Sequence, residues 1–383
     1  MPRRLLIARA ASPAGGKRGL ALGALLMVAL AGCGQKLPLP TPPPPPPIPS
    51  DQYVFAGEWA GYANVTDMLL TRHSFVSSLI VVQDSARIGA YVSKPATNAA
   101  LLQTTTSVAF APDSLVRPVH LAEAYDGTFY VADLGHQQRE ARLLHYSANG
   151  HTVLGHVVDR RTRLGATTIE WKTMEGVAVD SLGNIFVSGL VDSIIRNIAD
   201  DVPYDTVTAQ EVRRYATDGS ISVWGIRSSP SSLVATAHPT GLWATSQGLL
   251  VADAGDQGIP SRILMLSLTA PQLSVSSFGG AEGYLRKAAS PAPSSVSDVT
   301  ADVEGNIYFV DPPSARVLRT DPSGTVLYQL VNDPGQARNG TPLEAPLHLA
   351  ASIFRDPQSR LFNSTVFVAD PATQRIVQYD YNH

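Results

Sequence analysis

A short phrase of apolar, β-favouring residues returns six times along the chain. Each copy is rich in Val, Ile, Tyr and Phe, shows no helical periodicity and is closed by a turn residue. The closing positions recur at intervals of 49 to 64 residues. The clearest copies are Phe129–Asp133, Gly248–Asp253, Asn306–Asp311 and Val366–Asp370, and the weaker ones are Ile80–Asp84 and Asn184–Gly189. Repeats of this length and composition predict an array of small β-sheets.

The fifth repeat, Val296–Leu330, shows what one unit contains. Four β-runs follow one another, and Gly, Pro, Asp and Asn stand at each reversal between them. These residues supply the backbone conformations and local hydrogen bonds that tight turns need. Four antiparallel strands per repeat, arranged radially, make one blade of a β-propeller.

The two ends of the repeat region complement each other. The sixth repeat stops after its third β-run, Arg375–Asp380, whereas the run Gln52–Gly57 resembles the fourth-strand segment of other repeats. The N-terminal run is therefore expected to complete the last blade, which would remove the open sheet edges. The predicted fold is all-β, a six-bladed β-propeller with the N-terminal strand completing the last blade.

The repeat phrase also resembles a known family. Met174–Val187 and the later segments Asp311–Val317 and Asp370–Ile376 follow the pattern of the NHL-repeat propellers. The resemblance covers almost all of residues 51–383. It implies the propeller fold, and it says little about activity.

The first 33 residues are predicted to be an export signal. Five basic residues precede the apolar stretch Leu20–Ala31, which ends in Leu30-Ala31-Gly32-Cys33. The last four residues resemble a bacterial lipobox, and Cys33 is the only cysteine of the chain, so we expect it to be lipidated. An uncleaved membrane anchor and twin-arginine export are the alternatives.

Three segments follow from this interpretation. Residues 1–32 form a lipoprotein signal peptide, residues 33–50 contain the lipidated cysteine and a Pro-rich linker, and residues 51–383 form the NHL-like propeller. The linker is expected to be an extended, semi-rigid spacer. The protein is then tethered in the cell envelope, and Gly34 favours the outer membrane in a Gram-negative host.

The charge balance bears on the partners. Removal of the signal removes five basic residues and leaves 24 basic and 32 acidic ones, a net charge of about −8. This excess of negative charge argues against nucleic acid as a partner. We expect a monomer that is attached to the membrane through its lipid and that recognises an envelope protein, peptide or glycan.

Candidate chemistry concentrates where the innermost strand of each blade begins. The six equivalent positions carry Gly176, Gly241 and four polar residues, namely Asp67, His120, Asp298 and His348. Around a closed ring these four belong to consecutive blades and should face the mouth of the central channel. They could bind Zn²⁺, Mn²⁺, Fe²⁺ or Ca²⁺, or serve as general acid and base. The alternative, that no cofactor binds and the four are merely hydrated, is the leading expectation.

Two relatives by fold give context for this mouth. The peptide-amidating lyase is similar in using channel-facing histidines on zinc, although its histidine comes one residue earlier in the phrase than His120 and His348. Gluconolactonase-like propellers use a divalent metal held by Glu, Asn and Asp, and that set has no counterpart that the sequence identifies.

The aspartates that close the repeats admit two interpretations. Asp84, Asp133, Asp253, Asp311 and Asp370 could form a ring of ligand-binding carboxylates, or they could cap turns beside a downstream arginine. Their repetition in nearly every blade favours the structural role. The acidic segment Leu190–Val212 is expected to be a solvated loop insertion.

The leading functional hypothesis is a membrane-tethered binding or scaffold propeller. The alternative is a metal-dependent hydrolase or lyase with its site at the central channel mouth. No Walker-type loop, Gly-x-Ser-x-Gly elbow or HExxH motif occurs in the sequence.

Overall fold

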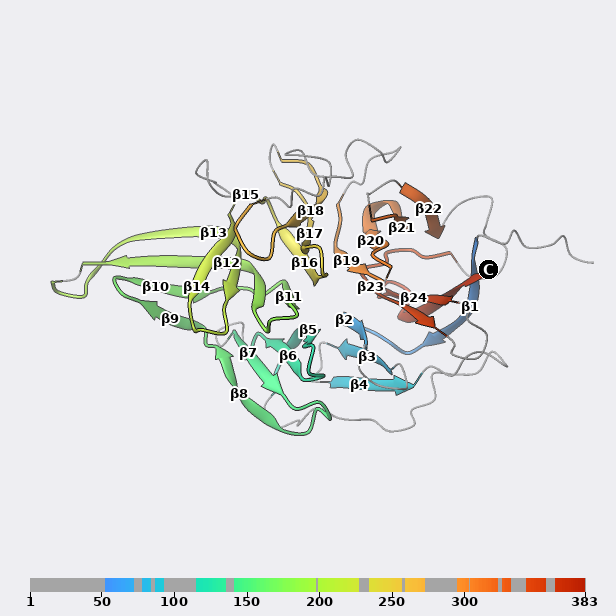
Figure 1. The fold of residues 1–383 in the computed structure, drawn as a ribbon, viewed down its shortest axis with the longest axis horizontal. Helices are drawn as coiled ribbons and strands as arrows, with labels where there is room; N and C mark the ends of the chain where they lie inside the picture. The colour runs from blue at the N-terminus through green and yellow to red at the C-terminus, as the bar shows by residue number, and fades with distance from the viewer. Residues whose placement is uncertain are drawn as a thin grey trace, which may run out of the picture. The chain divides into compact units, whose positions relative to one another are not determined.

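Six antiparallel β-sheets make up the folded part of the chain (Figure 1). The computed structural model describes residues 52–71, 78–83, 87–92, 115–135, 141–197, 199–226, 234–256, 259–272, 295–302, 304–322, 326–331, 342–355 and 362–382. The expected signal peptide, Cys33 and the Pro-rich linker lie outside these residues. In the described part of the chain, no helix is long and apolar enough to cross a membrane.

The first three blades contain the strands β2 to β15. Blade 1 contains β2 (Val65–Leu70), β3 (Ser78–Gln83) and β4 (Arg87–Val92). Blade 2 contains β5 (Pro118–Glu123), β6 (Phe129–Asp133), β7 (Arg142–Tyr146) and β8 (Val153–Val158). Blade 3 contains β9 (Arg161–Leu164), β10 (Thr167–Trp171), β11 (Gly176–Val179), β12 (Ile185–Arg196), β13 (Pro203–Tyr215), β14 (Ile221–Ile226) and β15 (Val234–Ala235).

The remaining strands form blades 4 to 6. Blade 4 contains β16 (Pro239–Ala244), β17 (Leu249–Asp253) and β18 (Arg262–Leu266). Blade 5 contains β19 (Asp298–Ala301), β20 (Ile307–Asp311), the 3₁₀ turn η3 (Pro312–Ser314), β21 (Arg316–Thr320) and β22 (Val326–Val331). Blade 6 contains β23 (His348–Arg355), β24 (Phe362–Asp370), β25 (Arg375–Asn382) and β1 (Gln52–Ala60).

The innermost strands of the blades close into a ring. Each contacts the innermost strand of the next blade, in the order β2, β5, β11, β16, β19, β23 and back to β2. An apolar cluster lies between every pair of adjacent blades, built from the alternating inward residues of both. This arrangement confirms the predicted six-bladed propeller.

The same turn chemistry recurs between the first and second strands of a blade. In blade 3, the Asp180 carboxylate accepts hydrogen bonds from the backbone N–H groups of Leu182 and Asn184, while Gly183 adopts a φ of 82°. Asp302 makes the equivalent bonds in blade 5, at the turn that contains Gly305. The phrase Asp-x-x-Gly-Asn thus encodes the reversal, because glycine tolerates the left-handed conformation that the turn requires.

The aspartates that close the second strands are structural. Asp133, for instance, is fully buried, accepts a 2.6 Å hydrogen bond from the Arg117 N–H and pairs with Arg142 at 2.8 Å. Such a carboxylate ties the segment before the inner strand to the end of the second strand. The same arrangement is found at Asp253 with Arg262, Asp311 with Arg316 and Asp370 with Arg375. Asp84 lies outside the described residues.

The expected closure of the ring by the N-terminal strand is confirmed. β1 pairs with β25 in antiparallel register from Gln52 opposite Asn382 to Ala60 opposite Arg375. The buried Tyr53 hydroxyl lies 2.7 Å from the Tyr308 hydroxyl of blade 5, so this strand also contacts the neighbouring blade.

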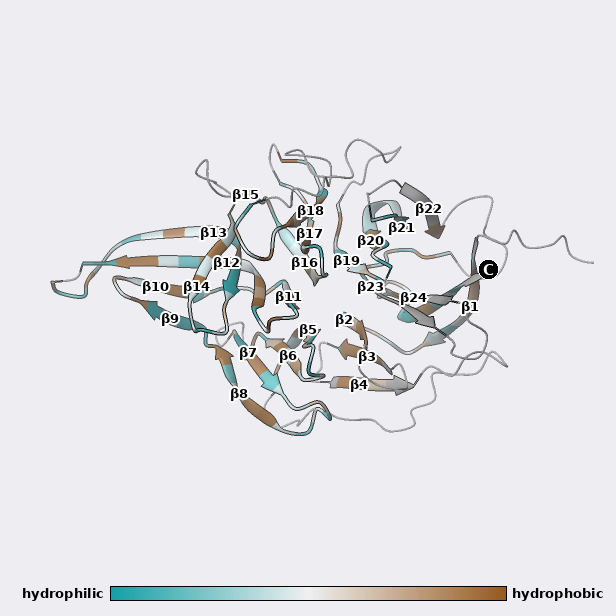
Figure 2. Cartoon of the chain, in the orientation of Figure 1, coloured by the Kyte–Doolittle hydropathy of each residue, from teal (hydrophilic) through white to brown (hydrophobic). Residues whose placement is uncertain are grey.

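The expectation of a loop at Leu190–Val212 is wrong. β12 and β13 continue through this segment as one long hairpin, and β10 and β9 extend the same sheet. Val191 and its partner Ala209 are buried, whereas residues 203–208 are exposed, so the hairpin changes from a packed to a solvated sheet along its length. β9, with Arg161 and Arg163, is hydrophilic in Figure 2.

Replacing Tyr53 by Ala should weaken the closure. Tyr53 is 6% exposed in a cluster shared by blades 5 and 6, and the loss of a buried aromatic side chain costs about 3–5 kcal/mol. We expect urea denaturation to show a decrease of this size in the free energy of unfolding. The matched control is Tyr125→Ala, since Tyr125 is 73% exposed and should change stability by at most about 0.5 kcal/mol. Equal effects of the two substitutions would contradict the role of β1.

Candidate functional site

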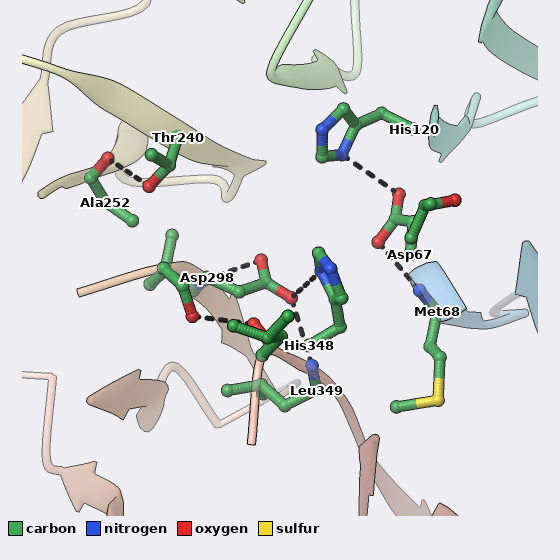
Figure 3. A network of polar contacts seen from close by, with 12 residues as sticks. Asp67, Met68, His120, Thr240, Ala252, Asp298, His348 and Leu349 are labelled. Carbon is green, nitrogen blue, oxygen red and sulfur yellow. Dashed lines mark hydrogen bonds and ion pairs between the residues drawn. The ribbon is translucent and has the colours of Figure 1, made fainter. Parts of the chain in front are cut away.

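The four polar residues predicted to face the channel do meet there. Asp67 on β2, His120 on β5, Asp298 on β19 and His348 on β23 belong to four consecutive blades of the closed ring, and Figure 3 shows them converging. Their convergence follows from their equivalent positions, close to the beginning of each innermost strand.

Backbone hydrogen bonds fix the direction of the two carboxylates. Asp67 accepts one bond from its own neighbour, Met68 N–H, and one of 2.7 Å from Leu121 N–H in the next blade. Asp298 accepts equivalent bonds from Val299 N–H and, at 3.0 Å, from Leu349 N–H in the next blade. Each carboxylate therefore joins two blades. A carboxylate has about four acceptor sites, so each can still bind a cation.

Each carboxylate also lies beside a histidine of the next blade. His120 Nδ1 is 3.6 Å from Asp67 Oδ2, and His348 Nδ1 is 3.7 Å from Asp298 Oδ2. The centroids of the two imidazole rings are 6.3 Å apart. Both Nδ1–Oδ2 distances are longer than a hydrogen bond. In the part of the chain that the structure describes, the buried His348 Nδ1 has no hydrogen-bond partner.

Three of the four residues lie close enough to share one ion. Asp67, Asp298 and His348 each offer a ligand atom, and these atoms lie within 4.8 Å of one another. His120 is not part of this set, and it contacts the set through Asp67. Sequence reasoning therefore identified the three donors together with a fourth residue at their edge.

Asp67, His120 and Asp298 line a small cavity in the channel. Its volume is about 20 Å³, enough for one ion or one water molecule and far too little for an organic substrate. Gly176 and Gly241 complete the wall, and a Cβ atom on Gly241 would come within 3.0 Å of Asp298 Oδ1. No Lys or Arg is among the described residues that line the cavity.

The indole of Trp243 bounds this cavity on its inner side. Trp243 extends from β16 of blade 4 and packs against the apolar clusters of blades 4–5 and of blades 1–2. It also lines a larger cavity of about 320 Å³ formed by the ends of the innermost strands. Trp243 therefore belongs to the walls of both cavities, and the carboxylates lie near the mouth where the innermost strands begin.

The electrostatics of the cavity favour a cation. Burial raises the pKa of Asp298, and the negative charge of Asp67 raises it further, while the His348 imidazole acts in the opposite direction. Two neighbouring carboxylates with no Lys or Arg beside them repel each other, so that one of them takes up a proton or the pair binds a positive ion.

The donor set fits a divalent metal ion of moderate hardness. Two carboxylates and one imidazole suit Mn²⁺, Zn²⁺ or Fe²⁺ better than Ca²⁺, which prefers oxygen ligands alone. Donor atoms of a tetrahedral zinc site lie about 3.4 Å apart, so the donor atoms, which are within 4.8 Å of one another, would have to move closer together to hold the ion. The buried Nδ1 of His348 without a partner provides a ready ligand.

A further acid–imidazole pair lies at the mouth, and sequence reasoning missed it. Glu175 directly precedes Gly176, and its Oε2 is 2.6 Å from Nε2 of His238, the residue before β16. Thr173 donates a 2.8 Å hydrogen bond to Oε1 of the same carboxylate. The signal in the sequence was weak, because neither residue occupies the repeat position that carries the other four.

Comparison with known proteins supports the fold but no family. No family model matches the sequence, and no curated protein matches it. The fold is similar to that of a candidate gluconolactonase, with a TM-score of 0.53 and 14% identity over 87% of this chain and 93% of that one. Two further similar structures are a gluconolactonase from Xanthomonas campestris (TM-score 0.49, 13% identity, 84% and 88% covered) and a luciferin-regenerating enzyme (0.44, 12%, 84% and 92%). The first of these similarities supports the propeller-type fold alone, whereas the NHL assignment is not confirmed.

The expectation of a non-enzymatic scaffold is wrong. The solved structure that this fold matches best among those above is described as a gluconolactonase candidate, which is an enzyme. The chemistry-bearing side chains also lie inside the channel, where the reacting group of a small molecule can approach them and a protein surface cannot. The alternative of a metal-dependent enzyme at the channel mouth fits these observations better.

The pair at the mouth should give stability a distinct pH dependence. Burial raises the pKa of Glu175, but its contacts with His238 and Thr173 outweigh burial and lower it, and the hydrogen bond to Glu175 raises the pKa of His238. The stabilisation is complete between about pH 4.3 and 6.5, the unfolded-state values of Glu and His. It is lost below this window as Glu175 becomes protonated, and above it as His238 loses its proton.

Urea unfolding of the wild type and of Glu175→Gln from pH 3 to pH 9 tests this. The difference in the free energy of unfolding should be largest inside the window and should shrink on both sides. A difference that stays constant over the whole range would contradict the pairing.

Proposed function

We propose that this protein is a metal-assisted hydrolase that opens a small ester or lactone at the mouth of the propeller channel. The observation that carries the proposal is the convergence of Asp67, Asp298 and His348 at a cavity whose described lining includes no Lys or Arg. The similarity in fold to a candidate gluconolactonase supports a lactone as substrate class.

The cavity and the channel mouth have different roles in the proposed reaction: the cavity holds the ion, and the mouth holds the substrate. A divalent cation at the carboxylates, when bound, supplies Lewis-acid polarisation of a carbonyl oxygen and favours ionisation of a water molecule. Asp67 and Asp298 hold their orientation through the backbone bonds between blades, so the donors are preorganised. Since the cavity admits only an ion or a water molecule, the substrate remains at the mouth, with its carbonyl group directed inward.

The remainder of the sequence interpretation belongs to this proposal. The repeats are of the NHL type, and the propeller is attached to the membrane through a lipid on Cys33, with residues 33–50 as a spacer. The lipobox-like ending Leu30–Cys33 and the polyproline stretch support this attachment. The enzyme then acts as a monomer in the cell envelope, at the outer membrane of a Gram-negative host.

Metal binding can be measured directly. Purified protein, stripped with a chelator and dialysed, is titrated with Mn²⁺ and with Zn²⁺ in a calorimeter. One ion per chain should bind, and Asp298→Asn should weaken its affinity by at least about 10-fold, because a ligand and half of the anionic charge are lost. Asp192→Asn is the matched control. Asp192 lies on β12 of the blade 3 hairpin, and its carboxylate forms a partly buried ion pair with Lys172.

Hydrolysis is tested on the same proteins with aldonolactones and simple aryl esters. Turnover should require the added ion and should fall at least about 10²-fold in Asp298→Asn, while Asp192→Asn retains wild-type activity. A protein that binds no divalent ion, or an Asp298→Asn variant with full activity, would contradict the proposed function.

The lipid attachment has its own test. In cells that process bacterial lipoproteins, the full chain should partition into the detergent phase after Triton X-114 extraction. Cys33→Ser should remain in the aqueous phase, because the acyl chains that anchor the protein are missing. Equal partitioning of the two proteins would exclude Cys33 as the anchor.

A further inference from the structure

Glu175 and His238 lie beside residues that line the small cavity. Glu175 directly precedes Gly176, which lines the small cavity, and His238 lies three residues before Gly241 on the opposite wall of the same blade interface. His120, which lines the same cavity, acts electrostatically on Glu175. The pair is therefore close enough to the cavity to meet a molecule whose carbonyl group reaches the carboxylates.

The pair is built like a proton-transfer dyad. The 2.6 Å contact from Glu175 Oε2 uses Nε2 of His238, and Thr173 holds the other carboxylate oxygen. In the described part of the chain no hydrogen bond uses His238 Nδ1, and the side chain is 41% exposed. One ring nitrogen is thus fixed by the carboxylate, and the other is open to the mouth.

The surroundings bias this imidazole towards its protonated form. The charged groups that act on the pair are Glu175 itself, His120 from β5, and Asp253 and Asp256 from the end of β17 and beyond. Asp253 accepts the His238 backbone N–H at 2.7 Å. The sum raises the pKa of His238, so the protonated imidazole, the form that a general acid needs, persists to higher pH.

We infer that His238 is the general acid of the proposed hydrolysis and that Glu175 is its positioning residue. This inference rests on the proposed function. A water oxygen adds to the carbonyl carbon, the bond from that carbon to the ester or ring oxygen breaks, and the imidazolium Nδ1–H gives its proton to the departing alkoxide. The imidazole then takes the proton that the water loses, so that water and lactone give a hydroxy acid and His238 returns to its initial state.

The role predicts a dependence on the leaving group. An alkoxide with a high pKa needs a proton to depart, whereas a nitrophenolate does not. His238→Gln should therefore lower kcat for a lactone by about 10²–10⁴-fold with little change in KM, and should lower kcat for a nitrophenyl ester by less than 10-fold. The control is His156→Gln. His156 lies on β8, away from the channel, and its Nδ1 is 3.5 Å from Oδ1 of Asp159. This substitution should leave both rates unchanged.

Glu175→Gln tests the positioning role through the pH profile. Because the acid must be protonated, the lactone kcat of the wild type should fall as pH rises through the pKa of His238. With Glu175→Gln this fall should move to lower pH, and ¹H–¹⁵N spectra of the histidine rings should show His238 titrating at lower pH, with or without Zn²⁺. A merely structural role would reduce stability without moving either curve.

The outcomes separate the two claims. If the wild type hydrolyses neither substrate class, the proposed function fails, and this inference fails with it. If the wild type is active but His238→Gln slows lactone and aryl ester equally, or behaves like His156→Gln, only the assignment of His238 is overturned. An unshifted His238 titration in Glu175→Gln overturns the role of Glu175.

Discussion

The pairing of β1 with β25 is the constraint on which the site depends. The propeller is a ring only because a strand from the beginning of the repeat region completes the blade that the end of the chain leaves unfinished. That closure brings β23 of blade 6 against β2 of blade 1, so that His348 and Asp67, which are 281 positions apart in the sequence, become neighbours. Without the closure, the donors would belong to opposite ends of an open array.

Buried aspartates have two roles in this fold, one structural and one in the channel, and their hydrogen-bond and ion-pair partners distinguish the two roles. At the ends of the second strands, as at Asp253, the carboxylate is satisfied by backbone N–H groups and by an arginine. Near the beginning of the innermost strands, Asp67 and Asp298 accept bonds from backbone N–H groups and lie beside histidines, and no Lys or Arg is among the described residues that line their cavity. The first arrangement is complete in itself, whereas the second retains negative charge that attracts a proton or a cation.

Much of the fold could be predicted because each blade repeats the same local rules. The Asp-x-x-Gly-Asn turn, the β-branched run and the closing aspartate are visible in sequence and fix strands and register. The β12–β13 hairpin was not predicted, because the four aspartates of this segment indicated a solvated loop. In the structure, β12 and β13 pair with each other from Ile185 opposite Tyr215 to Arg196 opposite Pro203. Polar residues on a sheet extension that is exposed along much of its length do not distinguish a strand from a loop, since an exposed strand needs no apolar face.

Only those site residues that occupy the repeat position could be predicted from the sequence. Asp67, His120, Asp298 and His348 share one repeat position, so the ring geometry alone places them together. Glu175 and His238 lie one and three residues before that position, and their 2.6 Å contact depends on how two segments approach the channel mouth. Repetition therefore builds the cavity that holds an ion, and departures from repetition supply the acid–imidazole pair beside it. That division explains how one architecture can keep its core constant while the chemistry at its mouth changes.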